Sequence, residues 1–214
     1  MAPSPKHPEP QGENQVRYQA SQSVSSHVRL RALEPEDLPR LQAWRNEPSL
    51  RQYFREYRAL NTTMQDTWFQ EQACRNTHIS MWGIVAEDLP DAPLIGACGL
   101  VPIHWVHRAA ELSIYIGYEH LNIDTHYAPE ALKHLIAYAF HELNLHRLWA
   151  EVYTLDTQKE ALYRTAGFTQ EGSMRDTYWH HGQWWGSTLW SLLSTDVAPV
   201  NEALSMKRSG LSSK

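Results

Sequence analysis

Several short stretches of this chain alternate polar and apolar residues, a pattern typical of β-strands with one buried face. Residues 27–33 show it first, with Val28, Leu30 and Ala32 on one side. The strands we expect are 27–33, 79–86, 94–103, 110–117, 147–153, 168–172 and 184–193. The connections among the second, third and fourth of them are short enough for an antiparallel meander, and the last two form a hairpin with its tip at 180–182.

Apolar residues recur at helical spacing between these strands. The clearest helix opens at Pro129 and Glu130, and its core positions follow at i, i+3, i+4 and i+7: Leu132, Leu135, Ile136, Ala139, Phe140 and Leu143. Other helices are expected through Leu38, Leu41 and Trp44, over 63–74 and over 157–166. Strands and helices in this order predict a mixed α/β (α+β) fold with one central sheet.

The two ends of the chain differ in composition from the body. Residues 1–26 carry four of the twelve prolines and many Ser and Gln, and residues 197–214 lose the periodic apolar pattern. We expect a disordered N-terminal tail (1–26), one domain (27–196) and a flexible C-terminal tail (197–214).

Charge and composition restrict the partners. The chain has 214 residues, 42% of them hydrophobic, and a formal net charge of -5, and the acidic excess lies in 27–196. This charge argues against nucleic acid and anionic membranes and favours a cationic partner. Two cysteines give no disulfide framework, and we see no signal sequence or apolar span, so we expect a cytoplasmic protein.

Four motifs resemble the GNAT superfamily of acetyl-CoA-dependent N-acetyltransferases. They are AELSIYIG at 110–117, EAL at 130–132, LHRL at 145–148 and ALYRTAGF with a following EG at 161–172. WRNEP at 44–48 and WF at 68–69 resemble the branch of ribosomal-protein alanine N-acetyltransferases. The resemblance covers about residues 27–195. It implies a mostly antiparallel sheet splayed between its fourth and fifth strands, with acetyl-CoA in the opening.

The resemblance also implies site residues. Main-chain groups of Ile114, Tyr115 and Ile116 would pair with the pantetheine arm as an added strand would. Acetyl transfer to an ammonium needs a base, for which Glu111 is the candidate, and the leaving thiolate needs an acid, for which Tyr163 is the candidate. The alternatives are a solvated strand-end glutamate and a packed core tyrosine.

The expected pyrophosphate loop departs from the family pattern. Glycines normally let its main chain curl around phosphate, but the aligned residues, which we still assign to the cofactor, are Asp124, Thr125, His126, Tyr127 and Ala128, after Ile123 in place of a basic or amide residue. Asp124 would repel phosphate unless it points away or caps the helix. Asp156 stands where the family commonly has a cofactor-contacting asparagine. Either Thr125 and His126 supply donors or the cofactor site has decayed.

The sequence thus predicts an N-acetyltransferase that moves an acetyl group directly to a primary amine in a ternary complex. The amine, on a small molecule or a peptide N-terminus, would enter beside Trp44, Arg45, Tyr53 and Phe54. The alternative is a GNAT-derived pseudoenzyme that binds or assembles a protein partner, and nine tryptophans leave a partner surface or homodimer open. Twelve histidines match no recognised ligand spacing, so no metal site is expected.

Overall fold

A computed structural model describes residues 26–197. Residues 1–25 and 198–214, most of the two predicted tails, lie outside the described residues. Two residues assigned to the tails are described. Ser26 donates a hydrogen bond to Glu130, and Val197 packs against the main hydrophobic core.

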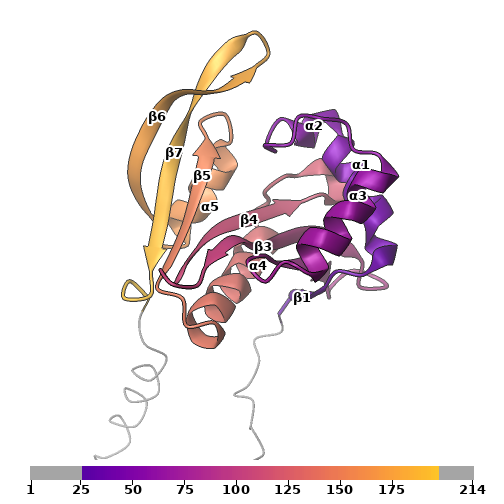
Figure 1. The fold of residues 1–214 in the computed structure, drawn as a ribbon, viewed down its shortest axis with the longest axis horizontal. Helices are drawn as coiled ribbons and strands as arrows, with labels where there is room; N and C mark the ends of the chain where they lie inside the picture. Colours follow the sequence, from indigo (N-terminus) through magenta and orange to yellow (C-terminus); the bar gives the residue numbers. More distant parts are fainter. Residues whose placement is uncertain (1–25, 198–214) are drawn as a thin grey trace, which may run out of the picture.

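The strands build one seven-stranded sheet in the order β1-β2-β3-β4-β5-β7-β6 (Figure 1). All neighbours are antiparallel except β4 and β5, which are parallel. This confirms the predicted mixed, mostly antiparallel fold. The strands are β1 Val28–Ala32, β2 Ser80–Ala86, β3 Leu94–His104, β4 Ala109–Ile116, β5 Arg147–Tyr153, β6 Thr169–His180 and β7 Gln183–Leu193.

Helices cover both faces of the sheet. They are α1 Leu38–Asn46, α2 Pro48–Arg51, α3 Thr62–Trp68, α4 Tyr127–Ala137 and α5 Thr157–Thr165. Single turns of 3-10 helix lie at Pro35–Asp37 and Tyr118–His120, and α3 and α4 continue as the π-helices Phe69–Cys74 and Tyr138–Glu142. The chain therefore takes the strand and helix order expected from its pattern, except that a short helix, α2, is added after α1. Helix α4 begins at Tyr127, two residues before the expected Pro129.

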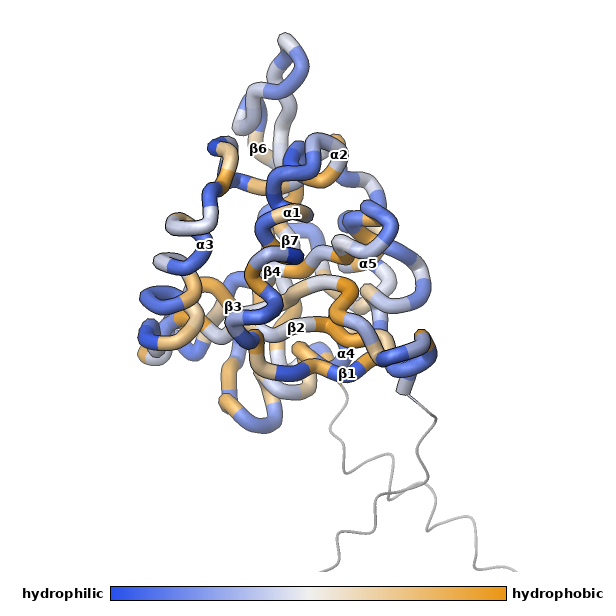
Figure 2. The backbone as a smooth tube through the Cα atoms, turned by 90° about the vertical axis from the view of Figure 1, so that its right-hand side faces the viewer, coloured by the Kyte–Doolittle hydropathy of each residue, from blue (hydrophilic) through white to orange (hydrophobic). Residues whose placement is uncertain are grey.

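Side chains of β4 alternate between two hydrophobic clusters, one on each face of the sheet. Ile114 and Ile116 belong to a core that includes residues of α4 and α5, whereas Tyr115 belongs to a second cluster with Leu41 of α1 and Phe69. Successive side chains of a strand point to opposite faces, so β4 contributes to both layers. In Figure 2 hydrophobic segments lie mainly in the central strands and hydrophilic ones mainly on the outer turns. Within the described residues no helix is both long and apolar enough for a membrane span.

The sheet opens between β4 and β5. Only three residue pairs join these strands: Ala109, Ala110 and Glu111 of β4 lie opposite residues 147–149 of β5. Beyond Glu111 the strands diverge, as Figure 1 shows, while β5 stays paired with β7 to its last residue, Tyr153. The predicted splay is therefore present, and the β6–β7 hairpin extends away from the body on the β5 side.

The projecting hairpin exposes two aromatic side chains. Trp179 is 55% and Trp184 58% exposed, with ring centroids 5.2 Å apart, while Trp185 is half-buried. Adjacent strand residues face opposite ways, so the Trp184–Trp185 pair divides between solvent and the body as the sequence indicates.

Candidate active site

The open edge of β4 presents main-chain groups to the opening. Hydrogen-bonding directions alternate along a strand, and Gly117 N–H donates to the Ile95 carbonyl of β3 at 2.8 Å. The main-chain groups of Ile114 and Ile116 therefore point away from β3. Ile116 N–H donates to the Asn122 carbonyl at 2.6 Å, whereas Ile114 has no strand partner on that side among the described residues. An amide-bearing ligand can add to this edge at Ile114.

Tyr115 lies on the other side of β4. Its main chain pairs with Ala97 of β3, and its ring packs 5.0 Å from the Phe54 ring in the second hydrophobic cluster. Burial raises the pKa of Tyr115 to about 12. Of the three neighbouring residues predicted to hold the cofactor, Ile114 and Ile116 direct their main-chain groups to the opening, and Tyr115 does not.

A large apolar cavity lies between α4 and α5. Its volume is about 900 Å³, and its lining includes Ile123, Asp124 and Thr125 of the expected pyrophosphate loop together with Lys133 of α4 and Leu162 of α5. Small-molecule sites commonly have this size and apolar character. A cavity of ligand size is therefore open beside the expected pyrophosphate loop.

Asp124 caps the N-terminus of α4. Its Oδ2 accepts hydrogen bonds from the main-chain N–H groups of His126 at 3.1 Å and Tyr127 at 2.8 Å, and its Oδ1 accepts one from Ala128 at 2.8 Å. The first N–H groups of a helix lack intrahelical partners and attract anions. The carboxylate of this chain therefore occupies the donors that a pyrophosphate would need, and the helix starts earlier than Pro129 because these donors are satisfied.

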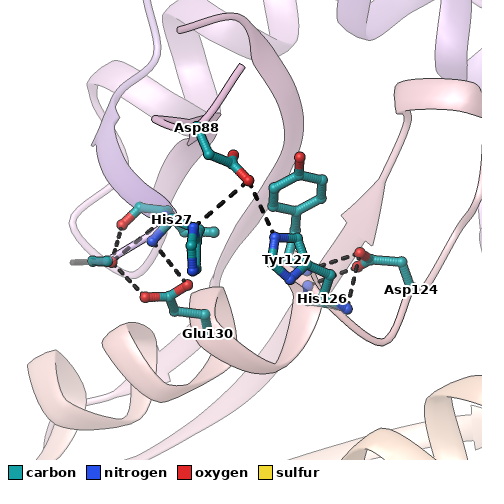
Figure 3. A network of polar contacts seen from close by, with 9 residues as sticks. His27, Asp88, Asp124, His126, Tyr127 and Glu130 are labelled. Atoms are coloured by element: carbon teal, nitrogen blue, oxygen red, sulfur yellow. Dashed lines mark hydrogen bonds and ion pairs between the residues drawn. The ribbon is translucent and has the colours of Figure 1, made fainter. Parts of the chain in front are cut away.

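The His126 side chain does not face this group of N–H donors. Its Nε2 lies 3.2 Å from Asp88 Oδ2, and its ring packs 4.5 Å from the Tyr127 ring (Figure 3). Of the two substitute donors expected from the sequence, Thr125 lines the cavity and the His126 imidazole is directed to Asp88.

Asp156 is buried and fully engaged by the protein. It caps α5 by accepting from Lys159 N–H at 3.0 Å, its Oδ2 accepts from Asn122 Nδ2 at 3.0 Å, and Lys159 Nζ lies 3.3 Å from the same oxygen. Asn122 follows β4 and Asp156 follows β5, so their bond ties the two diverging strands together. Asp156 thus shapes the opening and offers no free oxygen to a ligand.

Asn122 is a site candidate that sequence reasoning missed. It is 1% exposed, and its Oδ1 is buried with no hydrogen-bond partner among the described residues, while its neighbours Leu121 and Ile123 line the cavity. A buried acceptor without a donor costs about 1–3 kcal/mol, which a ligand N–H would recover. An isolated asparagine in a loop gives no sequence signal for this role.

Glu111 is the last residue of β4 that pairs with β5, and Arg55 binds its carboxylate. Arg55 Nη1 lies 2.7 Å from Glu111 Oε1, and its Nη2 lies 3.2 Å from Glu151 Oε2 of β5. Ser187 Oγ donates to the other Glu151 oxygen at 2.6 Å. One guanidinium therefore lies between two carboxylates that come from the two diverging strands.

The surroundings of Glu111 alter its basicity. Burial raises the pKa of Glu111, Arg55 lowers it, and the nearby Glu151 carboxylate raises it, with a net pKa above the ordinary value. Only 13% of the Glu111 side chain is exposed, against 52% for Arg55. A carboxylate with a raised pKa is a stronger base than a solvated one, as proton abstraction from an ammonium requires.

Tyr163 lies on α5, 1% exposed, with its ring 4.9 Å from that of Phe168. Burial raises the pKa of its hydroxyl, Asp156 and Glu111 raise it further, and Arg55 lowers it. The hydroxyl therefore keeps its proton at neutral pH. Because the charges of both Glu111 and Arg55 act on it, the predicted acid and base lie close enough to interact electrostatically.

The residues expected to line the amine entrance are mostly packed. Trp44 is 9% exposed, and its ring lies so close to Gly117 that a Cβ there would come within 2.0 Å of it. The Arg45 guanidinium covers the Phe54 ring at 4.7 Å and lines a cavity of about 450 Å³ beneath α1 and α3. Tyr53 is half-buried, and burial together with the Asp156 charge raises its pKa. Trp44, Arg45 and Phe54 thus support this side of the sheet.

Two tyrosines, Tyr153 and Tyr178, lie next to each other on the β5 side of the opening. Tyr153 stacks on Tyr178 with ring centroids 4.1 Å apart and planes 7° apart. The pKa of Tyr153 is raised overall, mainly by burial, and the charge of nearby Arg55 opposes this rise. The Arg55 guanidinium thus lies among the carboxylates of Glu111 and Glu151 and the side chain of Tyr153. Sequence reasoning missed Glu151 and Tyr178 because they join the site only through the parallel pairing of β4 with β5 and the fold of the hairpin.

Comparison with known proteins identifies the class. Residues 27–169 match the family model of the GNAT acetyltransferase domain. The chain belongs to this family, and it is an acetyltransferase that uses acetyl-CoA.

Individual relatives cover most of the chain. A spermidine N(1)-acetyltransferase of Vibrio cholerae is 27% identical over 172 residues, which are 75% of this chain and 90% of that protein. YdaF of Bacillus subtilis, named as a ribosomal N-acetyltransferase, is 30% identical over 179 residues, 81% of this chain and 94% of YdaF. The crystal structure of spermidine N-acetyltransferase from Vibrio cholerae with CoA and spermine has a TM-score of 0.73 at 23% identity and covers 80% of this chain and 98% of that one.

Proposed function

We propose that this protein transfers an acetyl group from acetyl-CoA directly to the primary amine of a small polycation. The observation that supports it best is the guanidinium of Arg55 held between Glu111 and Glu151 at the open end of the β4–β5 pairing. A primary ammonium carries the same charge and can donate to the same two carboxylates. The spermidine acetyltransferases among the relatives act on such an amine by name.

In this mechanism Glu111 takes a proton from the bound ammonium, directly or through a water molecule. The free amine then attacks the thioester carbonyl, and the C–S bond breaks. Arg55, half-exposed on a loop, gives up its place to the substrate, which keeps the two carboxylates neutralised. Cys98 is buried and burial raises the pKa of its thiol, so it is a poor nucleophile and a covalent enzyme intermediate is not needed.

Tyr163 acts on the leaving group. Its protonated hydroxyl donates a hydrogen bond to the sulfur as negative charge develops, and it relays to the thiolate the second proton that the attacking nitrogen loses, so that no tyrosinate, which the raised pKa of Tyr163 disfavours, is left. The pantetheine arm pairs with the open main chain at Ile114 and brings an amide N–H to Asn122 Oδ1.

Donor binding requires a change at the loop. The N–H groups of His126, Tyr127 and Ala128 suit a pyrophosphate, but the Asp124 carboxylate holds them. The donor phosphates therefore compete with Asp124 for the helix N-terminus, and Lys133 on the cavity wall offers a compensating positive charge.

The proposal is tested by calorimetry with acetyl-CoA and by product analysis with spermidine, an amino sugar and a peptide with a free N-terminus. We expect donor binding and acetylated spermidine as the best product. Glu111→Gln and Tyr163→Phe should each lower kcat by about 10²-fold or more with little change in donor affinity. Matched variants in the π-helical turn after α4, Glu142→Gln and Tyr138→Phe, should behave like the wild type.

Three outcomes would contradict the proposal. A peptide preferred over spermidine would reject the polycation, and full activity of Glu111→Gln would reject the base. No heat with millimolar acetyl-CoA would favour a second function, a protein-binding factor of this fold, for which the Asp124 cap is the specific observation.

A further inference from the structure

Two histidines and an aspartate from three separate segments converge next to the N-terminus of α4. His27 lies just before β1, Asp88 in the connection between β2 and β3, and His126 just before α4. Figure 3 shows both imidazole rings directed to the same carboxylate oxygen. His27 Nδ1 lies 3.6 Å and His126 Nε2 3.2 Å from Asp88 Oδ2, and all three atoms lie within 4.8 Å of one another.

We propose that His27 Nδ1, His126 Nε2 and Asp88 Oδ2 bind one divalent metal ion of the zinc type. Bonds of about 2.0–2.1 Å in a tetrahedron place neighbouring ligand atoms about 3.3–3.4 Å apart, between the two observed distances. The third edge joins the two imidazole nitrogens, which lie within 4.8 Å of each other, and it shortens to the same length when the ion binds. Imidazole nitrogen and carboxylate oxygen are the ligand types that Zn²⁺ prefers besides thiolate.

The remaining coordination position is open to solvent. The side chains of His27, Asp88 and His126 are 46%, 32% and 51% exposed, so water can complete the coordination shell.

Neighbouring contacts hold the ligands in position without the ion. The His27 main-chain N–H donates to Glu130 Oε2 at 3.1 Å, which fixes the start of β1 against α4. The main-chain N–H of His126 donates to Asp124. A bound ion would therefore link three segments of the chain directly beside the loop that the donor phosphates approach. Local spacing could not reveal the site, because its ligands are distant in the sequence.

The test uses the full chain, purified without a histidine tag and freed of metal with EDTA. Zn²⁺ is titrated in competition with a chromophoric chelator, and we expect one ion per chain. Because loss of a supporting contact alone costs about 10- to 100-fold in metal affinity, His27→Ala and His126→Ala should each weaken binding at least about tenfold. Saturating Zn²⁺ should raise the unfolding midpoint of the wild type by about 5 °C or more and that of the two variants much less.

His120→Ala is the matched control. His120 is also exposed and lies 3.8 Å from one carboxylate, that of Glu47, but it has no second histidine in reach among the described residues. The His120→Ala variant should bind Zn²⁺ like the wild type. Unfolding midpoints in EDTA show whether each variant folds, and Asp88→Asn, which keeps the shape of the cluster, replaces any that does not. Absence of stoichiometric binding, or equal affinity in His27→Ala, His126→Ala and wild type, would overturn the proposal.

Discussion

Arg55 controls the proton affinity of the predicted base. Three influences act on the pKa of Glu111: burial raises it, Arg55 lowers it and Glu151 raises it. Arg55 is the only one of the three carried by a half-exposed side chain on a loop, so it can be removed without disturbing the sheet. Its effect on Glu111 is therefore open to direct measurement.

We expect Arg55→Ala to move the acid limb of kcat/KM to higher pH. The base works in its ionised form, and without the guanidinium the pKa of Glu111 rises further above its ordinary value. A larger fraction of Glu111 is then protonated at a given pH below neutrality. A nearby opposite charge shifts a carboxyl pKa by about 1–3 units, and exposure of Arg55 favours the lower end, so we expect a shift of about one unit.

The pH profile of kcat/KM, which reports groups of the free enzyme, checks this expectation. Arg75→Ala removes an exposed arginine elsewhere and should leave the profile in place. An unshifted acid limb in Arg55→Ala would show that another group than Glu111 limits the rate on the acid side.

Single residues also show where sequence reasoning ends. Glu111 and Tyr163 could be chosen because they stand in recognisable motifs, and the structure places them within electrostatic reach of each other. Arg55 and Glu151 could not be chosen, because a loop and a strand bring them together only in the folded chain. Their chemistry depends on the distance between the two side chains in the folded protein, which a sequence motif does not give.

At the scale of elements, the Asp124 carboxylate occupies the N-terminus of α4, where the proposed function places the donor phosphates. Asp124→Asn keeps an oxygen that can cap the helix but removes the charge. Since even about 1.4 kcal/mol of relieved repulsion corresponds to tenfold in affinity, we expect acetyl-CoA to bind about tenfold more tightly. Calorimetry of the variant and wild type under the same buffer measures this difference.

A matched substitution separates this effect from a general loss of negative charge. Asp91→Asn changes the net charge equally but lies in the turn before β3. It should leave the donor affinity unchanged. Equal affinity in Asp124→Asn and wild type would mean that the carboxylate already swings away from the helix without cost.

The start of α4 also shows how side-chain chemistry modifies a predicted element. Apolar periodicity located the helix and its buried face correctly, and Pro129 indicated the usual first-turn position. The helix begins at Tyr127 because Asp124 satisfies three N–H groups at once, which periodicity does not encode. The π-helical turn at Tyr138–Glu142 likewise lies within the periodic stretch and leaves Phe140 buried.

For the whole molecule, the strand order was predictable to different degrees. Short connections predicted the β2–β3–β4 meander and the β6–β7 hairpin, because neighbouring antiparallel strands need little chain between them. The splay between β4 and β5 came from the resemblance to a family, whereas their parallel pairing was not predicted. Nothing in the local pattern of 110–117 or 147–153 indicates that the two strands pair for three residues and then part.

That short contact has a consequence for dynamics. Strands β1–β4 form one leaf of the sheet and β5, β7 and β6 the other, and within the sheet only the pairs at Ala109, Ala110 and Glu111 join the leaves. Acetyl-CoA bound along the free edge of β4 would supply hydrogen bonds where β4 and β5 no longer pair. Amide hydrogens of β5 and β7 should then exchange with deuterium more slowly in the presence of acetyl-CoA, as mass spectrometry of their peptides would show. Exchange unaffected by saturating acetyl-CoA would mean that the two leaves are already locked by the helices that cover them.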